Sequence, residues 1–232
     1  MFNANAGHYH MQGRLNCGVG LAGTIGSELS TREIKKVLVV TEAILVKLGV
    51  LDVVFDSLKE AGVDYVVFDG IEADPSAHLM DQVDGVLGVG GGSSMDSAKA
   101  ASILIANPGT HILDYKGDYT GVNRYQVTPV PCFAIPTTAG TGSEASWNIA
   151  INDTDNTLKV RTQNPHYVPV MSILDPKMMA TVPASVAAGC GIDAFVHAFE
   201  AYISTKGAWE FSDFMALEAM QLDCLLIEGP PD

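Results

Sequence analysis

The sequence predicts an α/β fold, with a doubly wound parallel sheet followed by an all-helical segment. Three observations predict it. Short apolar runs alternate with helical segments, a glycine-rich turn joins one such run to a helix, and no strand-like segment follows Pro183. Apolar strands that alternate with helices are typical of a parallel sheet covered on both faces. We therefore expect an α/β domain over residues 1–181 and a helical region over residues 182–232.

The strands are predicted from short apolar runs bounded by turn residues. In chain order they cover residues 37–40, 64–69, 85–89, 132–135, 147–151, 158–161 and 171–174. The helices are predicted over residues 43–61, 94–105, 184–204 and 209–227. We expect the first of these helices to break near Gly49, and Gly62 stands where a glycine commonly ends a helix.

The composition excludes some partners. The 232 residues carry a formal net charge of −14, and an acidic surface repels nucleic acid and anionic membranes. No uninterrupted run of 18 apolar residues and no secretory signal is present, so we expect no membrane partner and a cytoplasmic location. The cysteines at positions 17, 132, 190 and 224 lie far apart, which is typical of reduced thiols.

A glycine-rich turn over residues 88–96 joins a predicted strand to a predicted helix. Glycines let a phosphate approach the backbone amides closely, and the N-terminus of the helix offers unpaired N–H groups and a partial positive charge. Ser93 or Ser94 could cap that helix. A tight turn without a ligand is the alternative, but the strand before it and the helix after it favour phosphate binding.

Four motifs, in the same order, resemble the iron-dependent alcohol dehydrogenase family. Residues 88–100 resemble its pyrophosphate-binding loop, GGGSxxD, and residues 39–42 resemble its VTD element. Residues 136–144 read PTTAGTGSE, and residues 191–202 resemble its GMDALTHAIEAY helix. Such a resemblance implies a nicotinamide cofactor, a hydride transfer between an alcohol and an aldehyde or ketone, and a small alcohol or aldehyde substrate.

The resemblance also implies which residues contact the cofactor. They are Glu42, Gly90, Gly91, Gly92, Ser93, Asp96, Thr137, Thr138, Thr141, Asn148 and Lys159. Glu42, where the family has Asp, can accept hydrogen bonds from the ribose 2′-hydroxyl and repel a 2′-phosphate, which favours NAD over NADP. If the resemblance is set aside, Glu42 is interpreted as a glutamate at a helix N-terminus and Lys159 as a surface lysine.

The resemblance implies a divalent metal, Fe²⁺ or Zn²⁺, held in part by Asp193 and His197. Their spacing of four places both side chains on one face of a helix, where they can grip one cation that would polarise the alcohol oxygen. If the resemblance is set aside, an Asp and a His at this spacing more often have a structural role than bind a metal. The other histidines stand at positions 8, 10, 78, 111 and 166, so the two downstream histidine ligands of the family have no counterpart.

The sequence departs from the family in two places. The family's helical domain is expected to be truncated here, and residues 74–84 leave room for only a turn or two of helix, which makes cofactor contacts near Asp74 doubtful. The polypeptide is therefore expected to be inactive or incomplete alone, and it is compatible with a homodimer. A non-catalytic nucleotide-binding remnant and a glycerol dehydrogenase-like or dehydroquinate synthase-like relative remain as alternatives.

Overall fold

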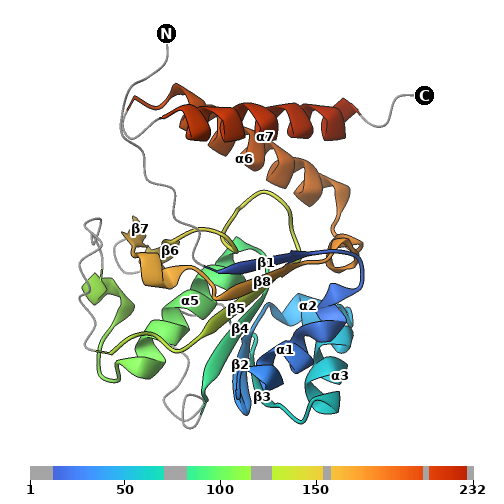
Figure 1. The fold of residues 1–232 in the computed structure, drawn as a ribbon, viewed down its shortest axis with the longest axis vertical. Helices are drawn as coiled ribbons and strands as arrows, with labels where there is room; N and C mark the ends of the chain where they lie inside the picture. The colour runs from blue at the N-terminus through green and yellow to red at the C-terminus, as the bar shows by residue number, and fades with distance from the viewer. Residues whose placement is uncertain (1–12, 71–82, 116–126, 154–157, 206–208, 229–232) are drawn as a thin grey trace. The chain divides into compact units, whose positions relative to one another are not determined.

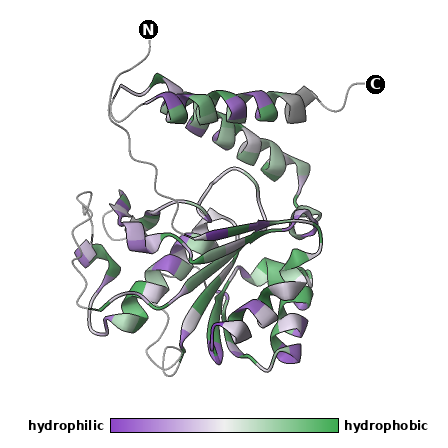
Figure 2. Ribbon diagram, in the orientation of Figure 1, coloured by the Kyte–Doolittle hydropathy of each residue, from purple (hydrophilic) through white to green (hydrophobic). Residues whose placement is uncertain are grey.

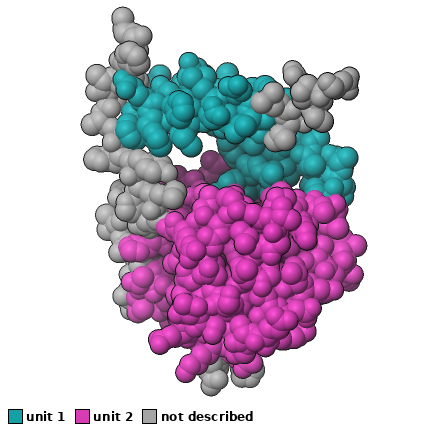
Figure 3. Space-filling view, turned by 45° about the vertical axis from the view of Figure 1, so that its right-hand side comes forward, with its two compact units in different colours: residues 1–11, 138–142, 182–232 teal, residues 12–137, 143–181 magenta. Residues whose placement is uncertain are grey.

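The computed structural model describes residues 13–70, 83–115, 127–153, 158–205 and 209–228 (Figure 1). Asp74 and the short connection around it lie outside these residues. The described residues form two compact units (Figure 3). An α/β unit comprises 13–137 and 143–181, and a helical unit comprises 138–142 and 182–228. The chain thus passes into the helical unit at residue 138, returns at residue 143, and leaves again after residue 181.

The α/β unit is built on a six-stranded sheet in the order β1-β8-β5-β4-β2-β3, with every neighbouring pair parallel. Its strands are β1 (Arg14–Cys17), β2 (Lys36–Val40), β3 (Asp64–Phe68), β4 (Gly85–Gly90), β5 (Cys132–Pro136) and β8 (Met171–Leu174). A separate antiparallel pair contains β6 (Asn148–Asp153) and β7 (Leu158–Gln163). The predicted parallel sheet is confirmed.

Helices cover both faces of this sheet. The shorter helices α1, α2 and α3 lie on one face and α5 lies on the other (Figure 1). Their bounds are α1 (Ile25–Thr31), α2 (Ala43–Lys47), α3 (Asp52–Glu60) and α5 (Gly92–Ala106). Short 3-10 turns are η1 (Leu21–Thr24), η2 (Ile112–Tyr115), η3 (Pro165–Tyr167) and η4 (Pro176–Met179). The predicted break is confirmed, because Gly49 has a φ of +69° between α2 and α3.

The side chains of β2 alternate between two buried clusters, which shows why both faces of the sheet are apolar. Val37 and Val39 belong to one buried cluster, together with residues of α1 and α3. Leu38 and Val40 belong to a second cluster, which includes Ala98 of α5. Successive side chains of a strand point to opposite faces, so a strand covered on both sides is apolar throughout.

The helical unit contains α6 (Ala184–Ile203) and α7 (Glu210–Glu228), which pack against each other. Among its described residues the buried apolar side chains are Ala198 and Ala216, both small. Many large apolar side chains of the two helices stay exposed, and Figure 2 shows hydrophobic colour along both ribbons. They include Ile192, Val196, Phe199, Tyr202, Ile203, Phe214, Met215, Leu217 and Leu222.

Helix α6 requires a correction to the sequence analysis, which found no uninterrupted run of apolar residues long enough to span a membrane. In the described part of the chain, it is the one helix long and apolar enough to cross a membrane by length and composition, which is weak evidence by itself. The criterion of 18 uninterrupted apolar residues does not detect α6, because Asp193, His197 and Glu200 interrupt the run.

Candidate functional site

The chain reverses its winding direction between β2 and β4. After β2 it continues to β3, on the far side of β2, whereas after β4 it continues to β5, on the opposite side of the sheet. Open parallel sheets bind ligands in the crevice outside the carboxyl ends of two such strands. Here Glu42 lies two residues after β2, and the glycine turn follows β4.

The glycine turn places backbone without side chains at the end of β4. Gly90 has a φ of +152°, and a Cβ atom there would lie 2.5 Å from the Ser94 hydroxyl oxygen, so a side chain is excluded. Gly91 is the N-cap of α5, and no side chain caps the helix. The expected cap by Ser93 or Ser94 is therefore wrong. Ser93 is exposed and the N-terminal amides of α5 stay available to a phosphate.

Glu42 is tied to the same turn. The Ser94 hydroxyl donates a hydrogen bond of 2.5 Å to Glu42 Oε1, and Ser94 is buried. Glu42 is the N-cap residue of α2, but its side chain makes no capping bond there. The carboxylate is therefore fixed beside the glycine turn.

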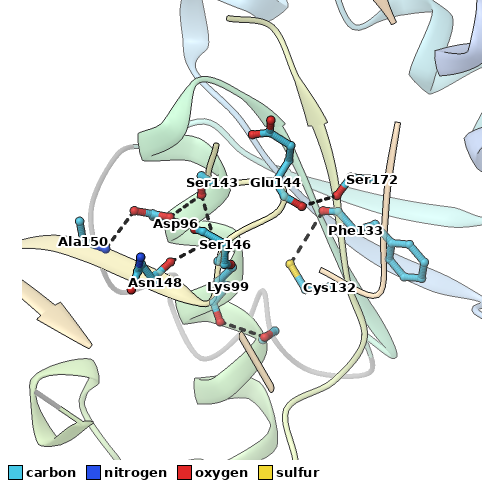
Figure 4. Close-up of polar contacts among 11 residues, drawn as sticks. Asp96, Lys99, Cys132, Phe133, Ser143, Glu144, Ser146, Asn148, Ala150 and Ser172 are labelled. Carbon is cyan, nitrogen blue, oxygen red and sulfur yellow. Dashed lines mark hydrogen bonds and ion pairs between the residues drawn. The ribbon is translucent and has the colours of Figure 1, made fainter. Parts of the chain in front are cut away.

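A buried lysine, which the sequence analysis did not single out, lies two turns into α5 (Figure 4). The ammonium of Lys99 donates to Ser143 Oγ at 2.9 Å, to the Asn148 carbonyl at 3.0 Å and to the Ser146 carbonyl at 3.1 Å. Burial lowers the pKa of Lys99, and the negative charge of Asp96, 3.4 Å away, opposes that shift. Lys99 thereby attaches α5 to the segment that leads into β6.

Asp96 completes this attachment. Its Oδ1 accepts a hydrogen bond from Ser143 Oγ at 2.5 Å, and its Oδ2 accepts one from the Ala150 N–H at 2.9 Å. Both carboxylate oxygens thus bind protein groups (Figure 4). The visible role of Asp96 is to hold β6 against α5, and its direct contact with a cofactor stays a prediction.

The neighbouring Cys132 thiol is a poor nucleophile. Burial raises the pKa of the Cys132 thiol to about 12, although the positive charge of Lys99 opposes the shift. A thiol with such a pKa is protonated at neutral pH and is unreactive. Burial also raises the pKa of Glu144, against the effects of its own backbone N–H and of Lys99.

The threonine loop begins beside the glycine turn. The N–H of Thr137, the residue after β5, donates to the Gly90 carbonyl at 2.9 Å and so fixes the two strand ends together. Thr138 and Thr141 belong to the helical unit. In that unit Gly140 has a φ of +132°, and a Cβ there would lie 2.1 Å from the Cys190 carbonyl oxygen of α6. Glycine is required for this close approach.

Some buried side-chain oxygens make no hydrogen bond within the described residues, among them Thr41 Oγ1, Thr138 Oγ1 and Asn148 Oδ1. Buried polar atoms are nearly always paired, so these atoms are candidates for a partner that the described residues do not supply. Thr138 and Asn148 are predicted cofactor contacts. Within the α/β unit, the Asn148 oxygen and the side-chain-free glycine turn are compatible with a polar nucleotide, and Thr138 lies in the helical unit. Lys159 is exposed on β7 and pairs with Asn152, four residues along β6 from Asn148.

Asp193 and His197 lie one turn apart on α6, with 3.9 Å between Asp193 Oδ2 and His197 Nδ1. Their side chains are 49% and 54% exposed, so the pair is accessible to a cation. Among the residues that the structure describes, no group of three His, Cys, Asp or Glu side chains could hold a metal. Asp193 and His197 therefore stay two predicted ligands, fewer than protein metal sites usually use.

Known proteins resemble this chain over most of its length. The chain is 36% identical over 214 residues to the NAD-dependent methanol dehydrogenase of Bacillus methanolicus, covering 88% of this chain and 55% of that protein. It is 33% identical over 221 residues to the lactaldehyde reductase of Escherichia coli, covering 91% and 57%. The crystal structure of NADH-dependent butanol dehydrogenase A from Thermotoga maritima superposes with a TM-score of 0.83 at 29% identity, covering 100% of this chain and 60% of that one.

The chain spans a little over half the length of the curated relatives it matches. The family model for iron-containing alcohol dehydrogenase matches residues 13–176, and the model for the C-terminal part of the same family matches residues 187–225. Both the α/β unit and most of α6 and α7 are therefore accounted for. The chain belongs to the iron-containing alcohol dehydrogenase family.

Proposed function

We propose that this polypeptide binds NAD in the crevice between β2 and β4 and forms the nucleotide-binding half of an alcohol:NAD oxidoreductase. The observation that carries the proposal is the reversal of winding between these strands, with the uncapped glycine turn on one side and the anchored Glu42 carboxylate on the other. In this arrangement the α5 amides receive the pyrophosphate and Glu42 receives the adenosine ribose.

The chemistry of the bound nucleotide is the acceptance of a hydride from the alcohol carbon. The residues of this chain bind and orient it. Asn148 Oδ1, buried and without a partner among the described residues, is the acceptor of the α/β unit that we assign to a polar group of the nucleotide. The substrate we propose is a small alcohol or aldehyde, since relatives are named for methanol, lactaldehyde and butanol.

For the polypeptide of 232 residues on its own, we propose nucleotide binding without appreciable turnover. Asp193 and His197 are the two metal ligands we assign, and a cation held by two groups stays largely hydrated and exchanges quickly. A non-catalytic nucleotide-binding protein is thus the second candidate. The glycerol dehydrogenase-like alternative is less favoured, because two of the relatives are named for methanol and lactaldehyde.

We also propose that α6 is part of a helical domain and does not span a membrane. It carries Asp193, His197 and Glu200, and the family's C-terminal model covers most of its length. A cytoplasmic location, the absence of a nucleic-acid partner and a homodimer stay proposals that rest on the composition and the family.

Calorimetric titration with NAD tests the proposal. We expect wild-type protein to bind NAD, and Gly90→Ala to lose at least about tenfold in affinity, since its Cβ would displace Ser94 at a φ of +152°. Gly109→Ala is the matched control. Gly109 also has a positive φ, of +83°, but nothing lies within 4 Å of the place that a Cβ atom would occupy, so NAD affinity should not change. No heat with wild-type protein at millimolar NAD would refute the proposal.

A further inference from the structure

We infer that Ser94 is a specificity-determining positioning residue, which holds Glu42 so that the crevice accepts the free 2′-hydroxyl of NAD and rejects the 2′-phosphate of NADP. The inference rests on the proposed NAD site and adds a residue to it. Ser94 does not touch the nucleotide in this scheme; it acts through Glu42.

The first observation is how the two side chains meet. Ser94 lies in the first turn of α5 and Glu42 lies after β2, 52 residues earlier, yet the Ser94 hydroxyl donates to Glu42 Oε1 at 2.5 Å. Ser94 is 2% exposed. A buried hydroxyl that loses its partner destabilises the fold, so the bond to Glu42 fixes the orientation of both side chains.

The second observation is that Ser94 binds only one of the two carboxylate oxygens of Glu42. Within the described residues, Glu42 Oε1 accepts the Ser94 hydroxyl and Oε2 has no hydrogen-bond partner. A carboxylate held by one oxygen presents the other at a fixed position. That free oxygen can accept a hydrogen bond from a ribose hydroxyl, whereas a phosphate on the same ribose would bring two negative groups together.

The third observation is the length of the side chain. Glutamate is one methylene longer than the aspartate of the family pattern, so it has an additional rotatable bond. Without an anchor it could swing its charge away from a 2′-phosphate. The Ser94 hydroxyl removes this freedom, and the partial positive charge at the N-terminus of α5 further favours the carboxylate there.

The dissociation constants of NAD and NADP, measured by calorimetry for wild type and for Ser94→Ala, test the inference. We expect wild type to prefer NAD, and Ser94→Ala to reduce the ratio of the NADP to the NAD dissociation constant by about tenfold. Ser102→Ala is the matched control. Ser102 is also a buried serine of α5, but its hydroxyl donates to the Lys99 carbonyl, so its removal should leave the ratio unchanged.

A double-mutant cycle separates positioning from a general structural effect. In a Glu42→Ala background, Ser94→Ala should not change the ratio further, because the group through which Ser94 acts is gone. Ser94→Cys, nearly isosteric with a weaker donor, should shift the ratio in the same direction and serves if Ser94→Ala does not fold.

The outcomes distinguish the two claims. If wild type binds neither nucleotide, the proposed NAD site is wrong and the inference is lost with it. If wild type binds NAD but Ser94→Ala and Ser94→Cys keep the wild-type ratio, the NAD site stands and the role of Ser94 is refuted. An equal effect of Ser94→Ala with and without Glu42 would also refute it.

Discussion

Single residues connect the first turns of α5 to the segments beside it through buried polar contacts. Lys99 was not found from the sequence because an isolated lysine is usually a surface residue. A signal was present, since Lys99 is the sole basic residue of the apolar segment over residues 92–106 and follows Asp96 by three positions. Glu42 was assigned from the family pattern, but its anchor on Ser94 depends on a contact across 52 residues, which no local pattern encodes.

Asp175, 1% exposed after β8, offers a pH-dependent test at this scale. Burial opposes its ionisation, but the N–H groups of Ala22, Gly20 and Lys177 donate to its carboxylate and hold its pKa below the usual 3.8. We expect Asp175→Asn to lower the free energy of unfolding by about 2 kcal/mol at pH 7.

The sign of the pH dependence follows from the lowered pKa. The stabilisation by ionised Asp175 is fully present above about pH 3.8 and is lost as the pH falls through the lower pKa of the folded state. Urea unfolding of wild type and variant at several pH values measures it. A difference between the two that stays constant down to the acid limit would contradict the assignment.

At the scale of elements, the strands of the sheet interior were predictable and its edge was not. Strands β2, β4 and β5 are continuous apolar runs because both faces are covered, and such runs are conspicuous. Strand β1 reads Arg-Leu-Asn-Cys, pairs only with β8 at the edge and is largely exposed, so it carries no apolar signal. Helix α1 was also missed; it is seven residues long and rich in Ser, Thr and Gly, which are weak helix formers.

The two long helices should be the least stable elements of this polypeptide. In the helical unit the buried apolar side chains among the described residues are two alanines, and helices gain most of their stability from packing an apolar face. We expect the backbone amides of α6 and α7 to exchange with deuterium at least about tenfold faster than those of β4, whose residues are all buried. Mass spectrometry of peptic fragments measures this. Equal protection of α7 and β4 would indicate a partner, such as a second copy, on the exposed face.

For the whole molecule, the proposed nucleotide site and the predicted metal ligands differ in how many of their residues one unit brings together. The α/β unit carries the glycine turn, Glu42 and Asn148 in one compact body, whereas the helical unit contributes Asp193 and His197 on a single helix. The parallel sheet and the helical region after it follow from the sequence pattern, but the grouping of residues 138–142 with the helical unit depends on the close approach of Gly140 to Cys190.

We accordingly expect no metal-dependent formation of NADH when the purified polypeptide is assayed with ethanol, propanediol or butanol and added ferrous or zinc ion. The reason is that hydride transfer needs the alcohol held in a fixed near-attack position, and two ligands on one helix do not hold a cation tightly. Absorbance at the NADH band is the measurement. Turnover that His197→Ala abolishes would show that the metal site is completed by other means.

The most direct test of the central claim, that NAD binds at the carboxyl ends of β2 and β4, is a map of amide exchange with and without saturating NAD. Slower exchange is expected in peptides that cover residues 40–43 and 90–96, where Glu42 and the start of α5 border the crevice. Peptides from α3 should not change, because Asp52–Glu60 lies outside the proposed contacts. Protection confined to other segments, or none at an NAD concentration that gives heat in calorimetry, would contradict the assigned site.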